Sequence, residues 1–276
     1  MKKTLSLILA LVMVFALGCF AGCGGSDNAD ASSKTDTANS SENNTQAAPV
    51  TTVTAGKLTM ATNAFFPPYE YYEGEKIIGI DAEIAEAIAN KLGLQLEIKD
   101  MEFSTIITAV NAGDADVGIA GMTVNPDRKL EVDFSVSYAN GVQAIIVKEG
   151  SAITCADDLY ADGVAYKIGV QLGTTGDTSC CDDFGSDRVT QYANGNEAIV
   201  ALLGGDVDCV IIDNEPAKSY VANNEGLKIL DTTYADEDYA IAIKKGNDAL
   251  REAIDKAILE LTADGTIDSI IDKYIK

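Results

Sequence analysis

The chain has 276 residues, which is enough for one large domain or two small ones with cores of their own. Its formal net charge of −23 argues against nucleic acid or anionic lipid as a partner, because both carry phosphate groups. The chain contains no histidine, which excludes the Ser-His-Asp arrangement and every histidine-based metal site. We therefore expect no nucleic-acid partner, no metal site and no cofactor.

Residues 1–22 have the pattern of a secretion signal. Two lysines near the start precede an apolar stretch over residues 7–17, which is too short to span a bilayer comfortably. Small residues then precede Cys23 in the sequence GCFAGCGGS, which is typical of a bacterial lipoprotein. We predict a lipoprotein signal peptide over 1–22, with Cys23 as the lipidated, palmitate-bearing first residue of the mature chain. Cys19 as the lipidated residue, or an ordinary signal peptide cleaved near Ala21, are the alternatives.

Residues 23–55 are predicted to form a linker. The segment that follows Cys23 has no aromatic and almost no large apolar residue, so it cannot bury enough surface to offset its ordering entropy. A flexible tether between a lipid anchor and a globular part is useful only outside the membrane. We therefore expect a lipid-anchored protein on the extracellular side of a Gram-positive cell membrane.

The remaining cysteines carry little information about function. An extracellular location permits a disulfide bond, but the sequence does not show which residues would pair, and free thiols are the alternative. These residues are Cys155, Cys180, Cys181 and Cys209.

From residue 57 onward, strand and helix patterns alternate. Residues 57–62 and 94–100 are predicted strands, and between them Gly79–Gly93 is predicted to be a helix with Asp81 as its cap and Gly93 as its stop. A second helix over 103–113, capped by Ser104 and stopped by Gly113, and a strand over 115–121 follow. This order indicates an α/β protein with a mainly parallel sheet.

The pattern of helix, glycine and apolar strand recurs 92 residues later, where Gly205 stands in the place of Gly113. The same offset places Asp213 on Gly121. Ligands of open α/β sheets bind beyond the carboxyl ends of the strands, so we expect Gly121 and Asp213 at one site, each supplied by its own lobe. The C-terminal residues are predicted to form two amphipathic helices divided at Gly265, with Leu250, Ile254, Ile258 and Leu261 in the core.

Several motifs together resemble the amino-acid-binding (family 3) extracellular solute-binding proteins of ABC importers. They are ATNAFFPPYEY, GIDAEIAEAIA, MEFSTIITAVNAGDADVGIAGMTVNPDRK, VDFSVSY, IGVQLGTTGD, DVDCVIIDNEPA and ADGTIDSIIDKY, and they cover residues 57–276. The MEFSTII and AGMT motifs are most similar to the glutamine-binding type.

This resemblance implies a type II periplasmic-binding-protein-like fold, with two lobes joined by two hinge strands and the ligand in the cleft between them. Lobe 1 would comprise residues 56–143 plus 239–276, and lobe 2 residues 144–238. The implied function is capture of a free amino acid and its delivery to an ABC transporter permease, by a monomer that is not an enzyme.

The resemblance also assigns the ends of the ligand. Arg128 aligns with the arginine that grips the α-carboxylate, and a guanidinium independently suits a carboxylate because its two parallel donors match the two oxygens. Ala120, Gly121 and Thr123 align with neighbours that add backbone and hydroxyl hydrogen bonds. Asp213 aligns with the acid that takes the α-ammonium. The alternatives are a surface arginine paired with Asp127 or Glu131, and an aspartate that only caps the next helix.

The remaining candidates surround the rest of the ligand. Phe66 and Phe103 align with aromatic walls, with ordinary core packing as the alternative, and Thr175 aligns with a loop at the carboxylate end. Asn63 and Gln171 occupy positions that vary with specificity in the family. Neither of them adds a charge, so we expect a neutral and polar ligand side chain.

Two other function classes remain open. A dehydratase of cyclic precursors of aromatic amino acids can share this fold, and fold does not fix function. Such an enzyme needs a general acid, for which Glu70, Glu102 and Glu215 are candidates. A ligand-binding sensory protein is the second alternative.

Overall fold

The computed structural model describes residues 50–275, apart from the side chains of residues 232–236. The predicted signal peptide, both candidate lipidation cysteines and most of the predicted linker lie outside the described residues. Within residues 50–275, none of the helices combines the length and the apolar character that a membrane span requires.

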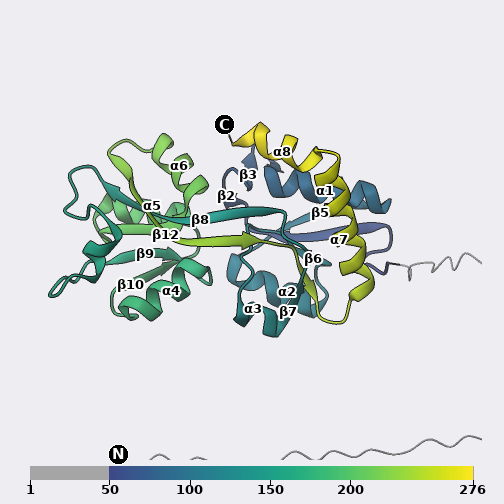
Figure 1. Ribbon diagram of the computed structural model, residues 1–276, viewed down its shortest axis with the longest axis horizontal. Coiled ribbons are helices and arrows are strands. Elements are labelled where there is room, and N and C mark those ends of the chain that lie inside the picture. The colour runs from purple at the N-terminus through teal and green to yellow at the C-terminus, as the bar shows by residue number, and fades with distance from the viewer. Residues whose placement is uncertain (1–49, 276) are drawn as a thin grey trace, which may run out of the picture. The chain divides into compact units, whose positions relative to one another are not determined.

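The first sheet has five strands in the order β5-β1-β6-β13-β7. The strand β1 runs parallel to β5 and β6, whereas β13 runs antiparallel to β6 and β7. The helices grouped around this sheet are α1 (Ile80–Leu92), α2 (Ile106–Ala112), α7 (Asp248–Ala263) and α8 (Thr266–Tyr274) (Figure 1). The strands are β1 (Lys57–Thr62), β5 (Gln95–Asp100), β6 (Val117–Gly118), β7 (Val132–Phe134) and β13 (Ala242–Lys244).

The first predicted strand and helix are confirmed, but the predicted cap is wrong. Strand β1 covers Lys57–Thr62, and helix α1 covers Ile80–Leu92 and ends at Gly93 in the left-handed conformation. No side chain caps the start of α1. Asp81 is instead fully buried and accepts hydrogen bonds from groups outside its own helix.

The second predicted helix begins as a short 3-10 turn, Phe103–Thr105, and continues as α2, Ile106–Ala112. Gly113 ends it with a φ of 82°, as predicted. Ser104 does not cap this helix, because neither segment has a side-chain hydrogen bond that caps its start.

The second sheet repeats the plan of the first, with strands in the order β10-β9-β11-β8-β12. The strand β9 runs parallel to β10 and β11, and β8 runs antiparallel to β11 and β12. Its strands are β8 (Ala139–Lys148), β9 (Ile168–Gln171), β10 (Val189–Tyr192), β11 (Cys209–Asp213) and β12 (Leu227–Tyr239), and its helices are α4 (Thr175–Phe184), α5 (Gly195–Gly204) and α6 (Asn214–Asn223).

Two long strands join the two sheets. The antiparallel ladder of β8 and β12 runs from the pair Lys148 and Leu227 to the pair Ala139 and Tyr239. In Figure 1 this ladder extends from the second group of elements into the first. The fold is therefore two-lobed, with lobe 1 built on the first sheet and lobe 2 on the second. The lobe boundaries drawn from the sequence stay predictions.

The internal repeat is confirmed. Helix α2 and strand β6 flank Gly113, and α5 and β11 flank Gly205, which has a φ of 87°. Both glycines end their helices in the left-handed conformation, and both following strands are buried. Each lobe therefore presents the carboxyl end of an equivalent strand.

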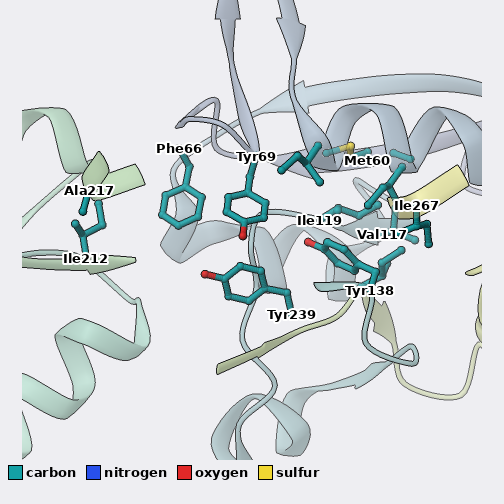
Figure 2. Close-up of a cluster of buried hydrophobic side chains, with 14 of the residues drawn as sticks. Met60, Phe66, Tyr69, Val117, Ile119, Tyr138, Ile212, Ala217, Tyr239 and Ile267 are labelled. Carbon is teal, nitrogen blue, oxygen red and sulfur yellow. The ribbon is translucent and has the colours of Figure 1, made fainter. Parts of the chain in front are cut away.

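The C-terminal segment folds back onto lobe 1. Helices α7 (Asp248–Ala263) and α8 (Thr266–Tyr274) are separated at Gly265, and the predicted apolar stripe of α7 is buried. Figure 2 shows buried side chains of this region, among them Ile267 of α8 and Val117 of strand β6, which belong to one hydrophobic cluster.

Three short segments complete the fold. A three-stranded antiparallel sheet, unexpected from the sequence, consists of β2 (Phe65–Phe66), β3 (Glu70–Glu73) and β4 (Lys76–Ile78). Helix α3 covers Pro126–Glu131, and a 3-10 turn covers Ala156–Tyr160. Among the described residues the cysteine side chains form no disulfide bond, and both Cys180 and Cys209 lie in the core of lobe 2.

Candidate functional site

The two lobes enclose a small pocket, with about 310 Å³ of empty space when its opening to solvent is included. All ten side chains predicted for ligand binding line the cavity, together with Glu70 and Thr174. The lining residues are Asn63, Phe66, Glu70, Phe103, Ala120, Gly121, Thr123, Arg128, Gln171, Thr174, Thr175 and Asp213.

The turn that follows β6 supplies the small residues of the site. Gly121 has a φ of 51°, and a Cβ atom there would lie 2.7 Å from the Phe66 ring. Its backbone N–H donates to Asp81 at 2.7 Å. This N–H is therefore committed to Asp81, and the close packing on Phe66 is a second reason for a glycine at this position.

Arg128 is positioned by the start of α3. The side chain of Asn125 accepts a hydrogen bond from the Arg128 backbone N–H at 2.8 Å, which caps the helix. The guanidinium donates to the carbonyls of Thr123 at 2.7 Å and Gly173 at 3.0 Å, and it lies over the Phe103 ring at 5.3 Å from the centroid. Because Thr123 belongs to lobe 1 and Gly173 to lobe 2, Arg128 connects the lobes.

The surface alternative for Arg128 is wrong. The side chain is only 8% exposed, and within residues 50–275 it forms no ion pair with Asp127 or Glu131. Burial lowers the pKa of the guanidinium, while the charges of Glu237 and Asp213 act in the opposite direction. A buried guanidinium offers parallel N–H donors that suit a carboxylate held between the lobes.

Asp213 ends strand β11 and faces the cavity from lobe 2. It makes no side-chain cap to α6, so the alternative of a simple capping residue is wrong. Its carboxyl group is 7% exposed and accepts a hydrogen bond from the Tyr239 hydroxyl. Burial and, next, the charge of Glu237 raise its pKa well above the ordinary value. No lysine or arginine among the described residues pairs with it, so the carboxylate lacks the cation that a buried charge requires.

Glu237 is a second buried carboxylate beside the site, and the sequence analysis did not identify it. It lies in β12, is 7% exposed, and accepts hydrogen bonds from Gln143 at 2.9 Å and from the Thr175 hydroxyl. The signal that could have found it is its place beside residue 238, the predicted boundary between lobe 2 and lobe 1, where side chains of both lobes converge.

Thr174 and Thr175 mark the start of α4. The Thr174 hydroxyl caps the helix by accepting from the Asp177 backbone N–H at 3.2 Å. The Thr175 hydroxyl lies 3.5 Å from the hydroxyl of Thr123 on the opposite lobe. A helix N-terminus favours negative charge, which fits the carboxylate end predicted for Thr175.

The predicted specificity residues contact each other across the cleft. The Gln171 amide donates to Asn63 Oδ1 at 2.9 Å, and the Asn63 amide donates to the Met101 carbonyl at 2.8 Å. Both side chains are 4% exposed. This part of the cavity therefore has a wall of uncharged amides.

The aromatic side chains are buried as expected. Phe66 and Phe103 are 7% and 9% exposed, and both line the cavity. The ring of Phe66 stacks on Tyr69 with centroids 5.6 Å apart, and Tyr69 meets the Tyr239 ring edge-on at 5.3 Å. Figure 2 shows the rings of Phe66, Tyr69 and Tyr239 near one another.

Glu70 lines the cavity with a buried carboxyl group that lacks a hydrogen-bond donor at one oxygen. It is 1% exposed, and its Oε2 atom has no hydrogen-bonding donor among the described residues. Burial, followed by the charge and hydrogen bonding of Asp81, raises its pKa well above the ordinary value. Burial raises the pKa of Asp81 to about 6, opposed by hydrogen bonds from Gly121 and Tyr138. Two adjacent buried carboxyl groups cannot both ionise readily, so the position of Glu70 beside Asp81 disfavours its charged form.

The other two candidate general acids lie away from the cavity. Glu102 is exposed, and Glu215 pairs with Lys218 at 2.6 Å. Within the described part of the chain, no group of three histidine, cysteine, aspartate or glutamate side chains could hold a metal ion.

Comparisons with known proteins place this fold and cavity in a family. Residues 58–276 match the model of bacterial extracellular solute-binding proteins, family 3. The chain is 31% identical over 284 residues to the arginine-binding extracellular protein ArtP of Bacillus subtilis, covering 99% of this chain and 98% of ArtP. It is 32% identical over 282 residues to the ABC transporter glutamine-binding protein GlnH of the same organism, covering 100% and 98%.

Among solved structures, an ancestral arginine-binding protein bound to glutamine superimposes with a TM-score of 0.75 at 41% identity, covering 80% of this chain and 99% of that protein. The chain belongs to family 3 of the bacterial extracellular solute-binding proteins and has their type II, two-lobed fold. The resemblance found in the sequence is confirmed, while the preference for the glutamine-binding type within the family stays a prediction.

Proposed function

We propose that this protein captures a single free amino acid outside the cell and delivers it to the permease of an ABC importer. The observation that carries the proposal is the pairing of charges in the cavity. One buried guanidinium, that of Arg128, faces a buried carboxyl group without a cation, that of Asp213. An α-amino acid has one carboxylate and one ammonium, and so complements both.

In this proposal the α-carboxylate binds Arg128, with the Thr175 end of α4 adding favourable potential. The α-ammonium binds Asp213, and Glu237 behind it strengthens the negative potential. The rings of Phe66 and Phe103 exclude water, which strengthens both charge interactions. The names of the two relatives given above state that one binds arginine and the other glutamine, which agrees with a site for one amino acid.

We further propose that the ligand side chain is neutral and polar. The Asn63–Gln171 pair offers uncharged hydrogen-bonding groups. Burial beside Asp81 raises the pKa of Glu70, which disfavours a full negative charge on this side chain. A cationic side chain would need a fully ionised partner at this depth.

Thermal unfolding in the presence of each of the twenty amino acids tests the function, because a ligand bound only by the folded state raises the melting temperature. We expect stabilisation by a neutral polar amino acid such as L-glutamine. Stabilisation by arginine alone would refute the side-chain assignment and leave the amino-acid function intact. No response to any amino acid would refute the function.

We propose that the bound amino acid leaves the site chemically unchanged. Of the three candidate general acids, Glu70 alone lines the cavity, and it lies buried beside Asp81. Incubation with prephenate is expected to give no turnover. Turnover abolished by Glu70→Gln would instead support the dehydratase alternative.

We also propose that the protein acts as a monomer anchored by lipid at Cys23. In a Gram-positive host, Cys23→Ser should release the protein into the medium, and Cys19→Ser should not. Release by Cys19→Ser alone would move the anchor to that residue. Sedimentation of the released protein should give the mass of one chain.

A further inference from the structure

Tyr220 joins the two lobes at a point outside the ligand cavity. It lies in α6 of lobe 2, and its hydroxyl donates a hydrogen bond to the backbone carbonyl of Phe65 at 2.8 Å. Phe65 belongs to β2 and immediately precedes Phe66, the aromatic wall of the cavity. Neither Tyr220 nor Phe65 lines the cavity itself.

This position distinguishes the contact from the other interlobe hydrogen bonds described above. Those join Arg128 to Gly173, Gln171 to Asn63 and Thr123 to Thr175, and they involve side chains that line the cavity. An entering ligand competes for these side chains or rearranges them. The Tyr220 bond has no group in common with the ligand, so it depends on the closed arrangement of the lobes alone.

The packing of lobe 2 holds Tyr220 in place for this contact. The ring lies against Gly195, the first residue of α5, where an added Cβ would lie 2.9 Å from the hydroxyl oxygen and 3.1 Å from a ring carbon. The side chain is 7% exposed, and burial raises the pKa of its hydroxyl, which therefore remains a donor. A tyrosine fixed within lobe 2 can make its bond to Phe65 only when lobe 1 is close.

We propose that Tyr220 is a positioning residue that stabilises the closed state and prolongs the lifetime of the bound ligand. The inference rests on the proposed function, because it assumes that an amino acid is held between the lobes. One net hydrogen bond corresponds to about a threefold to tenfold change in affinity. The change should lie in the dissociation rate, since the bond forms only after the ligand has entered and the lobes have closed.

The experiment compares full-length Tyr220→Phe with wild type by calorimetry and stopped-flow fluorescence, with L-glutamine and then L-arginine as the probes. We expect the dissociation constant to rise by about threefold to tenfold. The dissociation rate should rise by the same factor, with the association rate nearly unchanged. Gly195→Ala, whose Cβ would lie 2.7 Å from Ile212 Cδ1 and 2.9 Å from the Tyr220 hydroxyl, would crowd both side chains. It should act in the same direction and serves as the second variant if Tyr220→Phe folds poorly.

Tyr274→Phe is the matched control, because the Tyr274 hydroxyl donates to Glu83 within lobe 1 at 2.5 Å. Its affinity should equal that of wild type. Unchanged affinity in Tyr220→Phe, or a loss that lies in the association rate, would overturn the inference while leaving the proposed function intact. Failure of wild type to bind any of the twenty amino acids would remove the proposed function and this inference with it.

Discussion

Arg128 is the residue whose replacement tests the site most directly. Replacing it with alanine removes a cation that is 8% exposed and that donates to one backbone carbonyl on each lobe. A ligand carboxylate would then be desolvated between the lobes without a positive partner. Hydrogen bonds to charged groups contribute about 1.5–3 kcal/mol each, so loss of a bidentate pair should cost about 3 kcal/mol or more. This corresponds to at least about a 100-fold rise in the dissociation constant.

The same substitution should affect the ligand-free protein far less. It leaves the Thr123 carbonyl without its donor, which costs about 1–3 kcal/mol when the carbonyl is buried, and removal of a desolvated charge offsets part of that. Arg128→Lys should also bind weakly, because a single ammonium cannot reproduce the two parallel donors of a guanidinium.

Isothermal calorimetry with the amino acid that raises the melting temperature measures these effects. Arg251→Ala is the control, since that arginine pairs with Asp255 at 3.1 Å on the outer face of α7. Its affinity should match that of wild type. A dissociation constant for Arg128→Ala within about threefold of the wild-type value would refute the carboxylate assignment, because it corresponds to a loss of binding free energy of less than about 1 kcal/mol.

Three further changes test neighbouring parts of the site. Asp213→Asn should weaken binding by at least about tenfold in calorimetry, because the α-ammonium loses its anion; unchanged affinity would exclude this role. Gly121→Ala should lower the free energy of unfolding by about 1–3 kcal/mol more than Gly93→Ala does. Both glycines have a positive φ, but only Gly121 lies against the Phe66 ring. Equal losses of stability in urea titrations would contradict this contact. Asp81 has a pKa of about 6 in the folded protein and an ordinary value of 3.8, so its contribution to stability falls as pH rises from about 4 to about 6. Asp81→Asn should flatten this fall, and parallel pH profiles of the two proteins would count against it.

The sequence was sufficient where the local pattern alone determines the structure. The buried apolar run of β1, the periodic face of α1 and the left-handed glycine at position 93 predicted those elements correctly. The repeat was equally informative, because equivalent strands of two lobes present their carboxyl ends to one cleft. It predicted that Gly121 and Asp213 would lie at one site, and both line the cavity.

The sequence did not predict the structure where a polar side chain can lie either on the surface or in the interior. Asp81 has the residue type of a helix cap, yet it turns inward because Gly121 and Tyr138, which are distant in sequence, provide donors. Glu70 and Glu237 resemble the many surface acids of this chain, and only tertiary packing distinguishes a buried carboxylate from an exposed one. The partner of Tyr220 is a backbone carbonyl, which has no residue signature at all.

The two crossing strands also determine how the halves of the site could be exchanged between relatives. The chain enters lobe 2 along β8 and returns along β12, so the second sheet and its helices form one uninterrupted insertion into lobe 1. Asp213, Thr175 and Gln171 belong to that insertion, whereas Arg128 and the aromatic walls belong to the surrounding lobe. Recombination at two points in this ladder would therefore transplant the proposed ammonium site and half of the Asn63–Gln171 pair as a single block, with the proposed carboxylate site left in place.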